Sequence, residues 1–321
     1  MRTSPVQELK ALGQSLWLDN IRRQLVTSGE LARLREEGVS GVTSNPTIFD
    51  KAVSGSTDYT EALVRMVGAG YDAEHILWEL MLEDIRAAAD VFRPVYDETV
   101  GADGYVSIEV SPRLAMDTEG TVAMARDLFQ RAGRPNVMVK IPGTKPGLPA
   151  IRQMLGEGVN INVTLIFSTE RYDEVVDAFM SGLEDLKSAG GDPSRVSSVA
   201  SFFVSRVDTK VDKLLDARIE AASSPAVKGQ LARLLGKAGI ELQGSVRALE
   251  AAAQRSALGV TARRRRPAAA MSLGEHVDQG SPLSRHDVRR GADRPRHSGH
   301  YPPGYTSRLQ GAWRGASKPG R

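Results

Sequence analysis

The sequence predicts an α/β fold in which parallel strands, each followed by a helix, form a (β/α)8 barrel. Six short apolar or β-rich runs alternate with long amphipathic stretches, which is the pattern of parallel βα units. Each run has one apolar face and one face that carries polar groups near its C-terminal end. A doubly wound sheet would need two apolar faces, whereas the second face of a barrel strand lines the interior. The barrel is therefore the better interpretation.

The predicted strands lie at residues 16–19, 41–45, 105–110, 137–141, 160–167 and 197–204. Helical patterns cover residues 72–92 and 118–132, and a further one runs over about 225–253. The second has Asp117 placed to cap its N-terminus and Gly133 just past its end. No seventh or eighth strand is recognisable after the third helical pattern, so the barrel is predicted to be incomplete. Open strand edges would favour aggregation or instability.

Charge and composition divide the chain into a predicted barrel domain, residues 1–254, and a tail, residues 255–321. The first part holds 28 Lys and Arg against 35 Asp and Glu, whereas the tail holds 14 against 4. The tail has 13 arginines, clustered glycines and prolines, and neither strand nor helix periodicity, so we predict that it is disordered. A shift of reading frame in a GC-rich gene would produce this mixture; a natural basic tail is the alternative.

Several classes of site and location are disfavoured by residue usage. The chain has no cysteine, which excludes disulfides, thiolate nucleophiles and Cys-ligated metals. His75 is the only histidine of residues 1–254, and no Gly-rich dinucleotide turn follows the first strand, so we expect no metal and no organic cofactor. No apolar run approaches the length of a membrane span, and the first residues lack a signal-peptide core, so we expect a cytoplasmic location.

The polar face of each predicted strand follows from the alternation of side chains along it. The residues that share these faces are Trp17 and Asp19; Thr43 and Asn45; Ser107 and Glu109; Met138 and Lys140; Asn160, Asn162 and Thr164; and Ser201 and Phe203.

Lys140 is the only lysine in any predicted strand. Burial disfavours the ammonium form of a lysine, which makes the free amine available as a nucleophile toward a carbonyl. The alternative is a lysine at a strand end whose ammonium reaches solvent. Because Asp19, Asn45, Glu109 and Thr164 lie on equivalent faces, we favour the nucleophile.

Five segments together resemble transaldolases, in particular the longer bacterial type. In chain order, and within residues 10–252, they are LWLDNIRRQLVTSGELARLREEGVSGVTSNPTIFDKAVSGSTDY, SIEVSPRLAMDTEGTVAMARDL, VMVKIPGT, GVNINVTLIFS and ASFFVSRVD. The resemblance implies a TIM-type barrel of the class I aldolase kind. It also implies transfer of a dihydroxyacetone unit from sedoheptulose 7-phosphate to glyceraldehyde 3-phosphate, giving erythrose 4-phosphate and fructose 6-phosphate, in the non-oxidative pentose phosphate pathway.

Four matched residues would be catalytic if the resemblance holds. Lys140 would form the Schiff base with the donor ketose. Asp19 would be the general acid/base at the hydroxyl whose deprotonation cleaves the carbon–carbon bond. Glu109 and Thr164 would hold and polarise the water that carries protons during imine formation. The structural alternatives are a helix cap for Asp19 and a salt-bridge partner for Glu109.

Four more matched residues would bind substrate. Asn45 would bind the dihydroxyacetone moiety, Ser201 and Phe203 would line the pocket, and Arg206 would bind the phosphate through its planar fork of donors. Asn45 is alternatively a cap, Phe203 a core residue and Arg206 a surface residue. Asn162 also matches, and its role is left open between site and scaffold.

The chain departs from the transaldolase pattern where a seventh strand should follow the last helix. Residues 254–261 read QRSALGVT, and the cluster Arg263–Arg266 follows. Three alternatives remain: a catalytically impaired transaldolase-like protein, a related Schiff-base aldolase that releases free dihydroxyacetone, and a nucleic-acid-binding arm built on the arginine cluster. The arm has no aromatic platform or folded module with it. We therefore expect sugar phosphates as partners, without nucleic acid or membrane, and a monomer or homodimer.

Overall fold

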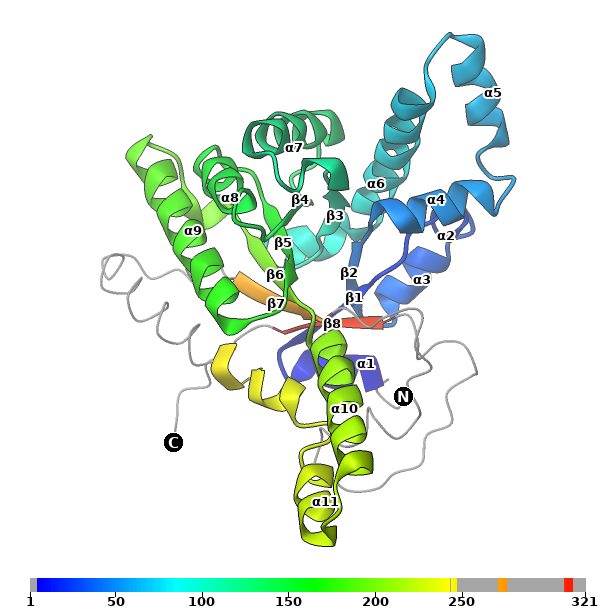
Figure 1. Ribbon diagram of the computed structural model, residues 1–321. Helices are drawn as coiled ribbons and strands as arrows, with labels where there is room; N and C mark the ends of the chain where they lie inside the picture. Colours follow the sequence, from blue (N-terminus) through cyan, green and yellow to red (C-terminus); the bar gives the residue numbers. More distant parts are fainter. Residues whose placement is uncertain (1–4, 243, 247–270, 276–308, 314–321) are drawn as a thin grey trace.

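Six parallel strands follow one another in chain order around a barrel, with helices on the outside (Figure 1). The computed structural model describes residues 5–242 and 244–246, and the backbone of residues 271–275 and 309–313. The parallel strands are β1 (Gln14–Leu18), β2 (Val39–Thr43), β3 (Val106–Glu109), β4 (Val137–Pro142), β5 (Ile161–Ile166) and β6 (Ser198–Phe202). Each overlaps one predicted strand, so the α/β barrel prediction is confirmed for this part of the chain.

Helices precede β1 and follow each of the six strands β1 to β6. The α-helices are α1 (Pro5–Ala11), α2 (Arg23–Thr27), α3 (Glu30–Glu36), α4 (Pro46–Ser54), α5 (Thr60–Gly68), α6 (Ala73–Glu98), α7 (Thr118–Ala132), α8 (Gly147–Gly156), α9 (Thr169–Ser188), α10 (Val204–Ala221) and α11 (Pro225–Ala232). Two short 3₁₀ helices are η1 (Pro112–Leu114) and η2 (Pro193–Arg195). Within the described ranges, no helix is both long and apolar enough to cross a membrane.

Two short strands that the sequence did not predict complete the ring. β7 (Met271–Glu275) runs parallel to β6, whereas β8 (Leu309–Trp313) is antiparallel to both β7 and β1. A regular (β/α)8 barrel has eight parallel strands, so the eightfold repeat is incomplete, as expected. Each of these two strands is only five residues long and contains a glycine. Such short segments show too little alternation of apolar and polar residues for a strand to be predicted from the sequence. The rest of the tail, predicted to be disordered, lies outside the described residues.

One predicted helix begins and ends at its predicted capping residues, and another does not. α7 begins after Asp117, whose carboxylate accepts from the Gly120 amide at 3.0 Å, and ends at Gly133 in the left-handed region, both as predicted. The single helix predicted over about 225–253 is wrong. α11 ends at Ala232, and Gly236 adopts φ 67°, which interrupts the helix before a second helical segment. Residues 247–253 lie outside the described part.

Apolar side chains pack between the strands and the outer helices, and others fill one end of the barrel interior. The outward faces of the strands pack under the helices in one large core. Inside, Trp17, Tyr105, Met138 and Val199 form a separate cluster toward the N-terminal ends of the strands. Trp17 fits there because Gly41 has no side chain: a Cβ at that position would lie 2.6 Å from the indole. Because this end is filled, the C-terminal end of the interior is left for a site.

Candidate active site

Lys140 and Glu109 form a buried ion pair on neighbouring strands. The Lys140 Nζ atom lies 3.4 Å from Glu109 Oε2, and the two side chains are 3% and 13% exposed. They are in register across β3 and β4, so the backbone ladder itself places them side by side. The alternative that Lys140 extends into solvent is therefore wrong. Burial disfavours the ammonium form of Lys140, and the Glu109 carboxyl beside the amine can exchange a proton with it.

The electrostatics of Glu109 suit a group that exchanges protons. Burial raises the pKa of the Glu109 carboxyl above its ordinary value, and the negative charge of Asp19 raises it further. The neighbouring Lys140 lowers the pKa but does not cancel the effect of burial. A carboxyl group with a raised pKa holds its proton closer to neutral pH than an exposed glutamate does.

Asp19 and Thr164 lie at the same end of the barrel. Asp19 directly follows β1 rather than ending the strand, and its side chain is buried. Its influence on the pKa of Glu109 indicates that the two carboxyl groups are near each other. Thr164 lies in β5, in register with Pro142 of β4, and is 1% exposed. The four catalytic candidates therefore come from the C-terminal parts of β1, β3, β4 and β5.

Three polar side chains form a hydrogen-bonded row inside the barrel. The Ser201 hydroxyl donates to Asn162 Oδ1 at 2.8 Å, and Asn162 Nδ2 donates to the Ser107 hydroxyl at 3.0 Å. All three are buried. The substrate-binding candidate Ser201 is thereby connected to Asn162, whose role the sequence left open.

Asn45 is the N-cap of α4 rather than a strand residue. β2 ends at Thr43, two residues earlier than predicted, and Asn45 Oδ1 accepts from the Ile48 amide at 2.9 Å. Pro46 at the first helical position, which suits a helix start, explains the shift. The cap interpretation of Asn45 is confirmed, and its side chain is only half-buried at the end of β2.

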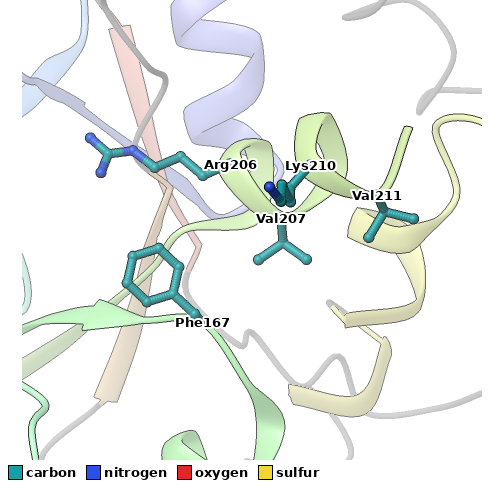
Figure 2. A pocket seen from close by; sticks show the side chains of 5 residues that line it. All are labelled: Phe167, Arg206, Val207, Lys210 and Val211. Carbon is teal, nitrogen blue, oxygen red and sulfur yellow. The ribbon is translucent and has the colours of Figure 1, made fainter. Parts of the chain in front are cut away.

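Phe203 and Arg206 lie beside each other at the start of α10. Phe203 follows the last residue of β6, so the strand is shorter than predicted, and it stacks on Phe167 with ring centroids 5.1 Å apart. The Arg206 guanidinium lies 4.7 Å from the centre of the Phe203 ring, a cation–π contact. Arg206 also lines a pocket with Phe167, Val207, Lys210 and Val211 (Figure 2).

The structure adds residues that the sequence did not single out as site residues. Ser107 shares the predicted face of Glu109, and that alternation was the available signal. The Thr43 hydroxyl is buried with no hydrogen-bond partner among the described residues. Phe167 and Lys210 line the pocket near Arg206, and no sequence pattern indicated them.

A metal centre would need a cluster of ligands. Within the part of the chain that the structure describes, no three residues of the His, Asp or Glu type lie close enough together to hold a metal ion. The polar groups at the barrel end are instead an amine, two carboxyl groups, hydroxyls and an amide.

The family model for transaldolase/fructose-6-phosphate aldolase matches residues 16–240. The chain belongs to this family. The match begins within β1 and includes the other five parallel strands, so it covers the part of the barrel that carries the candidate site.

Curated transaldolases from several bacteria are similar to this chain. The transaldolase of Acidothermus cellulolyticus is 54% identical over 215 residues, which are 67% of this chain and 58% of the relative. The Thermobifida fusca transaldolase is 53% identical over 230 residues, covering 71% and 62%. The Trichodesmium erythraeum transaldolase is 43% identical over 241 residues, covering 75% and 63%. The chain thus spans about three fifths of the length of these relatives.

Proposed function

We propose that the protein is a transaldolase that moves a dihydroxyacetone unit between sugar phosphates through a Schiff base on Lys140. The observation that carries the proposal is the buried Lys140–Glu109 pair, 3.4 Å apart, at the C-terminal end of the barrel of a transaldolase-family chain. The donor would be sedoheptulose 7-phosphate and the acceptor glyceraldehyde 3-phosphate, as in the non-oxidative pentose phosphate pathway.

The first stage is imine formation. The neutral amine of Lys140 adds to the ketose carbonyl, and the resulting carbinolamine loses its hydroxyl as water. Protons must reach that leaving oxygen, and Glu109, with its raised pKa, is the nearest acid beside the amine. Thr164 and Glu109 would hold the water that carries these protons.

The second stage is cleavage and transfer. Asp19 takes the proton of the hydroxyl on the fourth carbon, the bond between the third and fourth carbons breaks, and its electron pair moves into the iminium, giving an enamine. The shortened aldose phosphate leaves. The enamine then attacks the acceptor aldehyde, whose oxygen takes the proton back from Asp19, and water hydrolyses the new imine to release the longer ketose.

Substrate would be held at both ends. Asn45 and Ser201 supply an amide and a hydroxyl for the dihydroxyacetone part, and Phe203 provides an apolar wall. Arg206 would bind the phosphate, because its guanidinium is exposed beside the pocket and can donate two parallel hydrogen bonds. Sugar phosphates are therefore the proposed partners, without nucleic acid or membrane, and the monomeric or dimeric state and cytoplasmic location stay predictions.

An aldolase that releases free dihydroxyacetone is the second candidate, since the matched family includes fructose-6-phosphate aldolases. An impaired transaldolase is the third, favoured by the irregular closure of the barrel through antiparallel β8. Both share the proposed chemistry of Lys140 up to cleavage.

One assay separates these candidates. Purified protein is given fructose 6-phosphate with and without erythrose 4-phosphate, and both sedoheptulose 7-phosphate and free dihydroxyacetone are measured. A transaldolase makes sedoheptulose 7-phosphate only with the acceptor and releases little dihydroxyacetone; free dihydroxyacetone without acceptor identifies the aldolase. Absence of both products contradicts the proposal.

Lysine variants supply the matched control. Lys140→Arg should lower transfer by at least roughly a thousandfold, the scale of losing a group that forms the covalent intermediate. Lys145→Arg, at an exposed lysine five residues later in the chain, should leave transfer unchanged. Equal activity of the two variants would overturn the role of Lys140.

A further inference from the structure

β5 is irregular at its C-terminal end, where the strand reaches the mouth of the barrel. Val163 pairs with Ala200 of β6. Ile166 pairs with Phe202, so three steps along β5 correspond to two steps along β6. Leu165 has φ 60°, in the left-handed region that residues other than glycine rarely adopt. One extra residue on one strand, with an unusual backbone conformation beside it, is a β-bulge.

The bulge changes which residues of this segment face the outer helices. Ile161 and Val163 lie in the core between strands and helices, and Ile166 follows them there after a spacing of three residues instead of two. In a regular strand, Leu165 and Phe167 would take the positions that face the helices. Phe167 is instead 44% exposed and lines the pocket beside α10. The bulge therefore directs Phe167 to the mouth of the barrel.

Phe167 is connected to Arg206 through Phe203. The rings of Phe167 and Phe203 lie 5.1 Å apart with 23° between their planes, and the Arg206 guanidinium lies 4.7 Å from the centre of the Phe203 ring. The Phe203 amide donates to the Ile166 carbonyl at 2.9 Å, which joins the start of α10 to the end of β5. Figure 2 shows the Phe167 ring directed toward the Arg206 side chain.

These contacts restrict the Arg206 side chain. A guanidinium is attracted to the face of an aromatic ring, and paired aromatic rings favour particular mutual orientations. Arg206 is exposed, and fixing a flexible exposed arginine when a ligand binds costs conformational entropy. A guanidinium that already rests on an aromatic ring has lost part of that entropy before the ligand arrives. An anion should therefore bind more tightly while the aromatic pair is intact.

We propose that Phe167 is a positioning residue for Arg206: its ring holds Phe203 in the orientation that carries the guanidinium, so that the guanidinium is preorganised for a phosphate group. The inference rests on the proposed role of Arg206. Because Phe167 acts on the phosphate end of the substrate, its loss should weaken binding and leave the chemical steps at Lys140 unchanged.

The test measures turnover and anion binding separately for each variant. Turnover is described by KM and kcat for transfer from fructose 6-phosphate to erythrose 4-phosphate. Anion binding is the Kd of inorganic phosphate from isothermal titration calorimetry, which needs no turnover. Phe167→Ala removes the ring, whereas Phe167→Tyr keeps it. Phe167→Ala is also combined with Arg206→Ala, so that coupling between the two residues is measured.

Tyr71→Ala is the matched control. Tyr71 is 49% exposed, and its ring is stacked on that of His75 with centroids 4.4 Å apart, so it resembles Phe167 in exposure and in aromatic contact. It lies in the connection between α5 and α6, outside the candidate site. Circular dichroism checks that each variant folds.

We expect Phe167→Ala to raise KM and the phosphate Kd by about three- to tenfold, the scale of one cation–π contact, with kcat within about twofold of the wild-type value. Phe167→Tyr should keep both constants within about twofold. In the Arg206→Ala background, Phe167→Ala should add less than about twofold, because residues that act as one unit are not additive. Tyr71→Ala should leave KM, kcat and Kd unchanged.

The outcomes separate this inference from the proposed function. If the wild-type protein shows no transfer, the proposed function fails, and the phosphate Kd still tests the inference. If Arg206→Ala leaves that Kd unchanged, Arg206 does not bind phosphate and the inference fails with that role. If Arg206→Ala weakens binding and Phe167→Ala does not, only the inference is overturned.

Two other results would contradict the inference. Fully additive effects in the double variant would show that Phe167 acts independently of Arg206. A fall in kcat with KM and Kd unchanged would assign Phe167 to the chemical steps. If Phe167→Ala does not fold, Phe167→Leu decides, because leucine keeps the apolar bulk without an aromatic face: a Kd raised by about threefold supports the inference, and an unchanged Kd overturns it.

Discussion

Replacing Gly41 by alanine tests whether the barrel interior is filled as described. Gly41 lies on β2, in register with Trp17 on the neighbouring strand β1, and the Trp17 indole packs directly over it. A Cβ at this position would lie 2.6 Å from one ring atom of the indole and 2.7 Å from two others, closer than carbon atoms approach in proteins. The Trp17 side chain would have to move for the alanine to be accommodated.

The structure limits how far the indole can move. The indole nitrogen donates to Asp103 Oδ1 at 3.1 Å, Trp17 is 4% exposed, and its ring lies 6.4 Å from that of Tyr105. Overpacking of this kind costs about 1–3 kcal/mol. For a domain of this size, each kcal/mol lowers Tm by about 2–4 °C, so Gly41→Ala should lower Tm by about 2–12 °C.

Thermal unfolding followed by circular dichroism measures the effect. The matched control is Gly229→Ala, an exposed position in α11 with no atom within 4 Å of the added Cβ. It should leave Tm unchanged or raise it, because alanine is the better helix former. Adding Trp17→Phe to Gly41→Ala should restore part of the loss through coupling between the two sites. An unchanged Tm for Gly41→Ala, or purely additive effects in the double variant, would refute this packing.

Three further predictions concern the site. Burial raises the folded-state pKa of Glu109, so the stability that this group contributes is present below about pH 4.5 and is lost as pH rises through that pKa. The Tm of the wild type minus the Tm of Glu109→Gln should therefore fall between about pH 4 and about pH 8. A rise in this difference would contradict the burial argument. Arg206→Ala should raise KM for fructose 6-phosphate by roughly 10- to 100-fold, which corresponds to the loss of one charge-assisted hydrogen bond. The control Arg218→Ala, at an exposed residue further along α10, should leave KM unchanged. Equal KM values for the two variants would show that Arg206 does not bind the phosphate. EDTA should leave transfer intact, since the iminium accepts the electron pair that a metal would otherwise accept; loss of activity that zinc or magnesium restores would contradict this.

The strand faces could be predicted because alternation is a local property. Lys140 and Glu109 each stand on a polar face opposite valines and isoleucines, and the same alternation survives in the folded barrel. The ends of α7 could be predicted for a similar reason: Asp117 and Gly133 act on the helix that they border. Features of this kind need no knowledge of what lies across the sheet.

Other features depend on partners that are distant in the chain. The hydrogen-bonded row through Asn162 needs the register of β3 against β4 and of β4 against β5, which no residue spacing gives. The parallel and antiparallel pairings of β7 and β8 are likewise set by strands far away in sequence. Asn45 was predicted to end a strand and instead caps a helix, which is an error in a strand boundary. The Thr-Ser-Asn sequence continues the extended pattern, and only Pro46 indicates that a helix begins there.

Locating the covalent adduct tests the proposed Schiff base on Lys140 most directly. Wild-type protein is reduced with borohydride in the presence of fructose 6-phosphate, digested, and analysed by peptide mass spectrometry. We expect a single modified peptide, which contains Lys140 and carries the mass of a reduced three-carbon dihydroxyacetone unit or of the intact ketose phosphate. Modification of a different lysine, or no modification at all, would contradict it.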